Sequence, residues 1–163
     1  WGGSDTIRAS GLYQAVYDAG SYTIYDRDVT TTMEERNEMH RKTLTCDVFL
    51  MSANAISEDG QLVNIDGGGN RISAISFGPK SVIVLAGLNK VAKTLEDAVE
   101  RAQYTAAPIN AQRFSDSKIP CVETGICTEC TEDACICNYI SIVRRCIPPK
   151  KIKVLLIGEE IGY

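Results

Sequence analysis

Two nearly continuous apolar runs, Asp47–Ser52 and Ser81–Ala86, give the clearest hydrophobic signal in the chain. Runs of this kind are typical of parallel strands that are buried on both faces. The turn-forming triplet Glu58–Gly60 separates two shorter apolar stretches and predicts a hairpin between them. Strands are therefore expected at residues 22–25, 47–52, 55–56, 62–65, 81–86, 139–143 and 152–157.

Segments with helical character lie between these strands. Ser4 predicts a helix start, because its oxygen accepts from the free N–H groups of a first turn, and the helix is expected to end near Gly11 or Gly20. Residues 32–44 predict a helix that is charged on most faces, and residues 71–77 a helical turn. Residues 95–105 predict an amphipathic helix whose buried face carries Leu95, Ala98, Val99 and Ala102. The alternation predicts one α/β domain over residues 1–163 with a doubly wound, mainly parallel sheet.

Charge and cysteine content narrow the function classes. The net charge of -4, with 17 basic and 21 acidic residues, gives no positive field for a phosphate backbone, so nucleic acid is not an expected partner. No apolar run approaches the roughly 20 residues of a membrane span. An odd number of cysteines, seven, favours a reducing compartment, and we expect a cytoplasmic protein. A homo-oligomer stays open as a further partner class.

Motifs for catalysis are sparse. The single histidine, His40, lies on the charged helix and is expected to be solvated. No Gly-x-Ser-x-Gly elbow, paired-histidine motif or phosphate-binding loop occurs, so a general base would be a carboxylate, and Asp66 is the best candidate over Glu58 and Asp59.

Trp1–Ser4 places two glycines before a helix, an arrangement in which backbone N–H groups approach an anion. The alternative is a simple turn or a linker remnant, because Gly-Gly-Ser is also linker chemistry.

Asn64–Arg71 holds three successive glycines between polar side chains and predicts a ligand cradle. The alternative is a structural loop in which Asp66 and Arg71 pair with each other. The segment does not fit the Gly-x-Gly-x-x-Gly fingerprint, so a nicotinamide site is rejected.

Five of the cysteines fall in the cysteine-rich segment 119–138: Cys121, Cys127, Cys130, Cys135 and Cys137. The Cys127-x2-Cys130 spacing lets one turn present two thiolates to one metal ion. The expected ligands of zinc or an iron–sulfur cluster are Cys121, Cys127, Cys130 and Cys137, with Cys135 as a further candidate. An iron–sulfur cluster is usually bound by cysteines with two consecutive two-residue gaps, and this spacing is absent here. The alternatives are reduced packing thiols or a disulfide. Cys46 and Cys146 flank apolar strands and are interpreted as packing residues.

Several separated motifs together resemble one family, the lactate-utilization (LUD) domain, in its LutC/YkgG-like form. The resemblance rests on segments 1–4, 47–50, 54–60, 64–71, 78–80, 107–110, 136–138 and 158–163, and on Cys121, Cys127 and Cys130. It covers essentially the whole chain. Cys135, Cys146 and Gly68 depart from the family pattern.

This resemblance implies a three-layer α/β/α fold of the sugar-phosphate isomerase and CoA-transferase group (NagB/RpiA/CoA-transferase-like), without the usual N-terminal strand and helix. It also implies a role beside iron–sulfur partner subunits in the oxidation of lactate to pyruvate, as an accessory rather than a self-sufficient enzyme.

Three functional hypotheses follow. In the first, two glycine loops converge at the carboxyl ends of the strands and bind a small anionic ligand. The expected ligand-binding residues are Gly2, Gly3, Ser4, Asn54, Asn64, Asp66, Gly67, Gly69, Asn70 and Arg71. In the second, the cysteine-rich segment is a metal-stabilised docking surface for the iron–sulfur subunits. The third is a free-standing transferase or hydrolase of the same fold.

Overall fold

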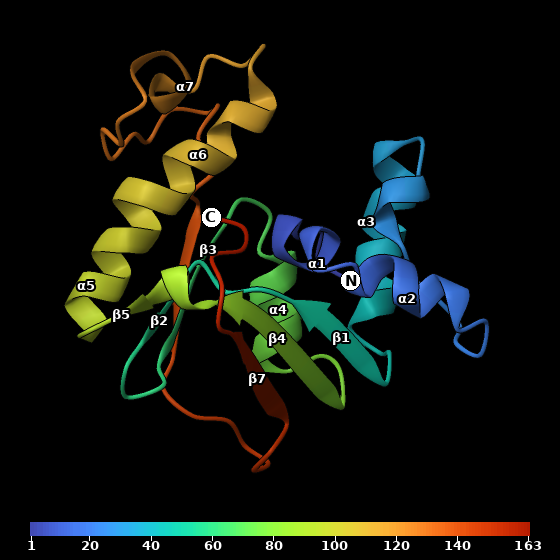
Figure 1. Cartoon of the computed structure of the whole chain (residues 1–163). Coiled ribbons are helices and arrows are strands. Elements are labelled where there is room, and N and C mark those ends of the chain that lie inside the picture. Colours follow the sequence, from blue (N-terminus) through green and yellow to red (C-terminus); the bar gives the residue numbers. More distant parts are fainter. The chain divides into compact units, whose positions relative to one another are not determined.

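The computed structural model describes residues 1–163 and divides them into two compact units (Figure 1). Unit 1 contains Trp1–Ser52, Ser73–Leu88 and Cys146–Gly162. Unit 2 contains Ala53–Ile72, Asn89–Arg145 and Tyr163. Each unit has its own sheet, whereas the sequence predicted a single one.

The sheet of unit 1 is parallel throughout. It contains β1 (Val48–Met51), β4 (Ser81–Gly87) and β7 (Ile152–Ile157), in the order β1-β4-β7. The two apolar runs form β1 and β4, with Phe49, Val82 and Val84 almost fully buried. The predicted buried parallel strands are confirmed.

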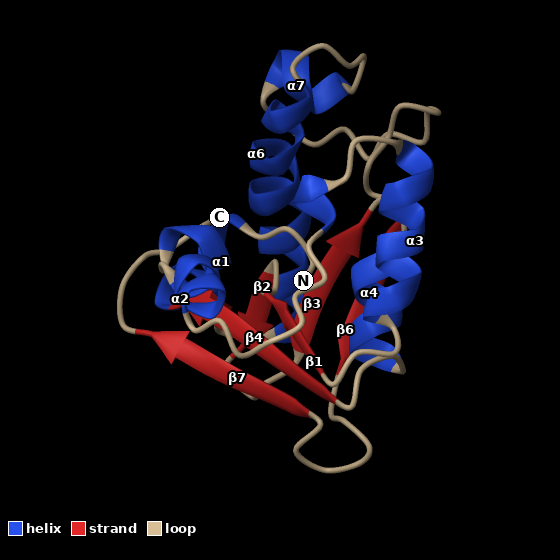
Figure 2. Ribbon diagram, turned by 90° about the vertical axis from the view of Figure 1, so that its right-hand side faces the viewer, coloured by secondary structure: helices blue, strands red, loops and turns tan.

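Helices cover both faces of this sheet. The unit contains α1 (Asp5–Ala9), α2 (Leu12–Asp18), the 3-10 turn η1 (Arg27–Val29), α3 (Met33–Thr43) and the last turn of α4 (Asn70–Ser76). In Figure 2, α1 and α2 lie on one face and α3 and α4 on the other, which confirms the three-layer α/β/α architecture. Leu50 and Leu85 face α1, where they pack with Trp1 and Ile7.

Local sequence signals explain where these helices begin and end. Ser4 caps α1 as predicted, accepting from Ile7 N. Gly11, at φ 73°, separates α1 from α2, and α2 ends shortly before Gly20, so the one predicted helix is two helices and the first ends near Gly11. The strand predicted at residues 22–25 is wrong. This segment pairs with no other strand; instead the Tyr25 carbonyl accepts from Trp1 N at 3.1 Å, before the turn at η1.

The sheet of unit 2 contains β2 (Ala55–Ser57), β3 (Leu62–Asp66), β5 (Val91–Ala92) and β6 (Tyr139–Val143), in the order β5-β2-β3-β6. The predicted hairpin is confirmed as the antiparallel pair β2–β3. Strand β6 is antiparallel to β3, and β5 is parallel to β2.

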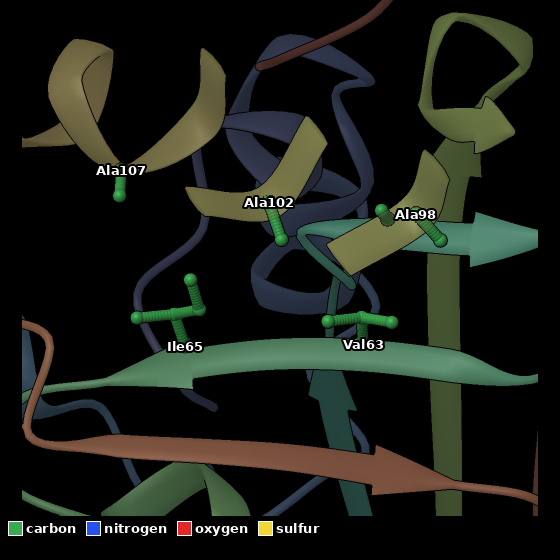
Figure 3. Close-up of a cluster of buried hydrophobic side chains, with 6 residues drawn as sticks. Val63, Ile65, Ala98, Ala102 and Ala107 are labelled. Carbon is green, nitrogen blue, oxygen red and sulfur yellow. The ribbon is translucent and has the colours of Figure 1, made fainter. Parts of the chain in front are cut away.

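One long helical segment covers a face of this sheet. It runs through α5 (Leu95–Glu100), the π-helical η3 (Arg101–Ala106), α6 (Ala107–Ala111) and the 3-10 turn η4 (Gln112–Phe114). Small alanines let it approach β3 closely, so that Ala98 and Ala102 lie against Val63 and Ile65 (Figure 3). The predicted buried face is confirmed, but the helix continues past Pro108. Pro108 lies in the first turn of α6, directly after the π-helical η3.

The remaining elements are short. They are η2 (Leu88–Lys90), which follows β4, and α7 (Pro120–Thr124), which opens the cysteine-rich segment. None of the helices combines the length and the hydrophobicity that a membrane crossing needs.

Candidate functional site

The N-terminal glycine loop lies beside the carboxyl end of β1. Gly2 N donates to the Leu50 carbonyl at 3.2 Å. The indole of Trp1 is buried, stacks on Tyr13 with ring centroids 4.0 Å apart, and donates through Nε1 to Asp26 Oδ1 at 2.7 Å. The loop is therefore fixed in unit 1 by both its backbone and its aromatic residue.

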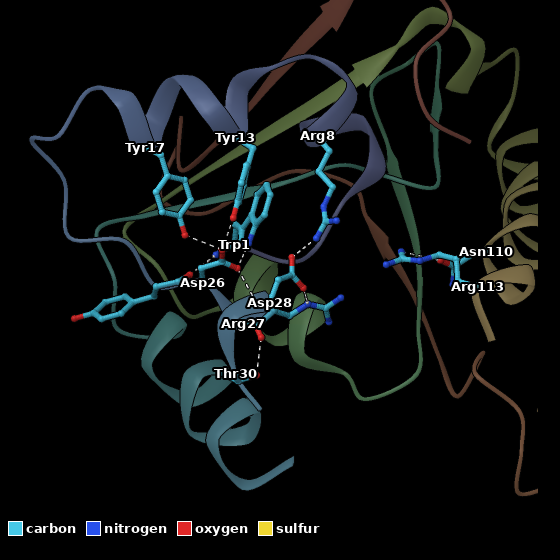
Figure 4. A network of polar contacts seen from close by, with 11 residues as sticks. Trp1, Arg8, Tyr13, Tyr17, Asp26, Arg27, Asp28, Thr30, Asn110 and Arg113 are labelled. Atoms are coloured by element: carbon cyan, nitrogen blue, oxygen red, sulfur yellow. Dashed lines mark hydrogen bonds and ion pairs between the residues drawn. The ribbon is translucent and has the colours of Figure 1, made fainter. Parts of the chain in front are cut away.

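Asp26 is the centre of a polar cluster that the sequence did not predict (Figure 4). Besides Trp1, its carboxylate accepts from Tyr13 Oη at 2.6 Å, Tyr17 Oη at 2.7 Å and Asp28 N at 2.8 Å. Burial alone would raise the pKa of Asp26, but these hydrogen bonds outweigh it and lower the pKa below its usual value. The carboxylate is thus held in its charged form.

Two arginines lie next to this loop. Gly3 has a φ of 64°, and a Cβ at this position would lie 2.2 Å from Arg27 Nη2, so only glycine leaves room for the guanidinium. Arg27 and Arg8 both pair with Asp28, Arg27 through Nε at 3.5 Å. The loop therefore has positive side chains beside it, which sequence spacing did not reveal.

The Asn64–Arg71 loop lies in unit 2 and joins β3 to α4. Asp66 Oδ2 accepts from Arg71 N at 2.9 Å and from Ile72 N at 3.4 Å, so this carboxylate caps the start of α4. Arg71 Nη2 donates to the Ile65 carbonyl at 2.6 Å and lies 3.6 Å from Asp66 Oδ1. The structure thus contains the Asp66–Arg71 pair that was the alternative to a ligand cradle.

The glycines of this loop are close to the Ile136–Tyr139 segment. A Cβ on Gly67 would lie 3.2 Å from the Ile136 carbonyl oxygen, and Asn138 Nδ2 donates to the Gly67 carbonyl at 3.0 Å. Gly69 has a φ of 75° and packs against the Tyr139 ring. Close approach and a left-handed backbone therefore explain two of the three glycines.

Asn64 is unusual among the predicted residues. Its side chain is fully buried, and neither Nδ2 nor Oδ1 has a hydrogen-bond partner. It lies on β3 two residues before Asp66, so both side chains point to the same face of the strand, opposite the face that Val63 and Ile65 present to α5 and η3.

Asn54 has a different role. Its Oδ1 accepts from Ile65 N at 3.0 Å, and its carbonyl accepts from Arg101 Nη1 at 2.5 Å. These contacts tie the hairpin to the long helical segment.

The five clustered cysteines line one cavity of about 160 Å³ in unit 2, together with Ile65, Gln103, Ala107, Pro108, Ile119, Thr128, Glu129, Ile136 and Ile140. None of the seven cysteines of the chain forms a disulfide. Burial, and then the neighbouring thiols, raise the pKa of Cys137 to about 12. No three His, Cys, Asp or Glu side chains stand in an arrangement that would hold a metal ion.

The remaining two cysteines make local contacts in unit 1. Cys46 Sγ donates to the carbonyls of Thr43 and Val48, and Cys146 Sγ accepts from Ile152 N at 3.5 Å. These contacts agree with the packing role expected of them.

The predicted site residues are divided between the units. Gly2, Gly3 and Ser4 belong to unit 1, and Asn54, Asn64, Asp66, Gly67, Gly69, Asn70 and Arg71 belong to unit 2. The convergence of the two loops on one ligand stays a prediction.

Comparison with known proteins gave one match. The family model described as the LUD domain matches residues 1–157, in agreement with the resemblance drawn from the separated motifs. No curated protein and no solved structure matches the chain.

Proposed function

Because the chain belongs to the LUD domain family, which implies a role in lactate utilization, we propose that it is a LutC/YkgG-like accessory protein of lactate oxidation. In this role it binds a small carboxylate such as lactate or pyruvate and acts with iron–sulfur partner subunits.

The observation that carries the ligand proposal is the buried amide of Asn64, which has no protein partner. A buried polar group without a partner costs about 1–3 kcal/mol, and nearly all such groups in native proteins are served by protein, water or ligand. An amide offers both donors and an acceptor, which match the carboxylate and hydroxyl of a 2-hydroxy acid.

Arg71 supplies the positive charge of the proposed site. Its contacts with Ile65 and Asp66 both use Nη2, which leaves Nη1 and Nε as donors for a carboxylate. Asp66 is already bound by two backbone N–H groups and faces this guanidinium, so we assign it to positioning Arg71 rather than to proton transfer. That assignment favours an accessory protein over an independent enzyme.

Calorimetric titration of the full chain with lactate, pyruvate and a sugar phosphate tests the proposal. We expect lactate or pyruvate to bind. Arg71→Ala should weaken this binding at least about tenfold, a loss of roughly 1.4 kcal/mol in binding free energy. Arg41→Ala, on the exposed face of α3, is the matched control and should bind as the wild type does. Absence of any binding that depends on Arg71 would refute the proposal.

Asn64→Val separates a ligand role from a structural one. Valine suits a buried strand and removes the partnerless amide, so we expect the variant to unfold at a higher temperature while losing ligand affinity. A variant that binds the acid as tightly as the wild type would show that Asn64 does not contact the ligand.

A further inference from the structure

The cavity lined by five cysteines is chemically distinct from the proposed carboxylate site. Its lining is otherwise apolar apart from Gln103, Thr128 and Glu129, and it contains no lysine or arginine. Thiolates are soft ligands that prefer zinc-class ions, so a cavity lined by five thiols is suited to an ion of this class.

Backbone hydrogen bonds to sulfur give a second, independent observation. Glu129 N donates to Cys127 Sγ at 3.5 Å, and Cys137 N donates to Cys135 Sγ at 3.4 Å. In both cases the donor lies two residues after the sulfur. A neutral thiol is a weak acceptor, whereas a metal-bound thiolate is stabilised by such donors in its outer shell. Two sulfurs of the segment therefore already have a backbone donor of the kind that surrounds a metal-bound thiolate.

Contacts with the long helical segment hold the loop that carries the first of these sulfurs, and the helix α7 that precedes this loop. The Tyr104 hydroxyl donates to the Glu129 carboxylate, and Gln112 Nε2 donates to the Cys121 carbonyl at 3.2 Å. After α7, residues 125–138 form no helix or strand. The sulfurs are not in coordination geometry in the structure, so metal binding requires this irregular segment to close locally around the cavity.

We propose that this cavity binds one thiophilic, tetrahedral divalent ion of the zinc class through Cys121, Cys127, Cys130 and Cys135. All four line the cavity, and Cys135 Sγ is one of the two sulfurs that accept a backbone N–H. Cys137 packs against the cluster that contains Ala102 and Ala107, so we assign it to the core and not to the metal. This set replaces Cys137 of the sequence-based prediction with Cys135. Four S–H bonds break on binding, four protons leave, and the four thiolates with one divalent ion carry a net charge of −2.

Metal titration of the full chain tests the stoichiometry. The reduced protein is stripped with a chelator and titrated with Co²⁺ and then Zn²⁺ without oxygen. We expect about one ion per chain, the visible absorption of a tetrahedral Co²⁺–thiolate centre, and its loss when Zn²⁺ displaces Co²⁺. Failure to bind either ion, or assembly of an iron–sulfur chromophore from added iron and sulfide, would overturn the proposal.

Variants test the choice of ligands. Loss of an outer-shell partner alone weakens metal binding about 10–100-fold, so Cys127→Ser and Cys135→Ser should weaken Co²⁺ binding by at least about 100-fold. The matched control Cys137→Ala should bind one ion with wild-type affinity. Binding that depends on Cys137 but not on Cys135 would refute the ligand set.

Thiol modification of the wild-type chain gives the same information without a variant that fails to fold. Zn²⁺ should slow alkylation of four of the seven cysteines by at least about tenfold and leave Cys46, Cys137 and Cys146 unchanged, as read by peptide mass spectrometry. Uniform reactivity with and without Zn²⁺ would contradict the site.

Discussion

Replacing Asp26 with asparagine tests the polar cluster that fixes the N-terminal loop. In the wild type, Oδ2 accepts from the hydroxyls of Tyr13 and Tyr17, and Oδ1 accepts from Trp1 Nε1 and Asp28 N. Asparagine keeps one oxygen, so Asp26→Asn preserves one pair of contacts and loses the charged acceptor of the other pair.

The magnitude follows from these contacts. A hydrogen bond to a charged group contributes about 1.5–3 kcal/mol, so two lost bonds amount to roughly 3–6 kcal/mol. The tyrosine hydroxyls can accept from the new amide, which restores about 1 kcal/mol for each neutral bond. We therefore expect a net loss of about 1–4 kcal/mol, which at roughly 2–4 °C per kcal/mol lowers the Tm by about 2–16 °C.

The pH dependence has a definite sign. The folded-state pKa of Asp26 is lowered, so its contribution to the free energy of unfolding is present above the unfolded value of about 3.9 and is lost as the pH falls through the folded pKa. The difference in Tm between wild type and Asp26→Asn should therefore shrink in acid.

Differential scanning calorimetry at neutral and acidic pH measures both effects. Asp47→Asn is the matched control, because Asp47 pairs with Lys80 at 2.8 Å and both side chains are 83% exposed. Such a pair contributes roughly 0–1 kcal/mol. Equal Tm values for the two variants at pH 7 would refute the role of the cluster.

Three further substitutions, the first with a matched control, probe unit 2. Gly69→Ala should lower the free energy of unfolding by about 1–2 kcal/mol in urea denaturation, because an L-residue is strained at φ 75° beside the Tyr139 ring. The control Gly68→Ala should change this free energy by less than about 0.5 kcal/mol. Thr94→Ala removes the capping box of α5 and should lower the free energy of unfolding by about 1 kcal/mol. Amide hydrogen exchange in the first turn of α5 should become faster, and an unchanged exchange rate would contradict the capping role. Arg101→Lys should lower the free energy of unfolding, measured in urea, by about 1.5–3 kcal/mol, because the half-buried guanidinium bridges two backbone carbonyls that one ammonium does not span. A urea midpoint equal to that of the wild type would disprove the bridge.

Local patterns predicted most of the elements, because their signals lie within a few residues of one another. The apolar runs of β1 and β4, the turn between β2 and β3 and the serine cap of α1 are of this kind. The apolar segment at residues 22–25 failed because a strand needs a pairing partner, which local sequence does not specify. The division into two sheets depends in the same way on long-range pairing, such as that of β3 with β6.

The parts of the candidate site that could be predicted are those whose chemistry follows from the spacing of residues along the sequence. The cysteine spacing predicted that thiols of one segment lie together, and five of them line one cavity, while their role as metal ligands stays a prediction. The Asp26 cluster was missed, because Trp1 and Tyr13 reach Asp26 from positions 25 and 13 residues away. The missing partner of Asn64 is a property of packing, which no sequence pattern displays.

The burial of Trp1 also provides an optical reporter. It is the only tryptophan of the chain, it stacks on Tyr13, and its indole N–H is held by Asp26, all within unit 1. Emission excited selectively at the indole therefore monitors unit 1, while far-ultraviolet circular dichroism records helices of both units. Comparing the two signals during denaturation shows directly whether the units melt together or in sequence.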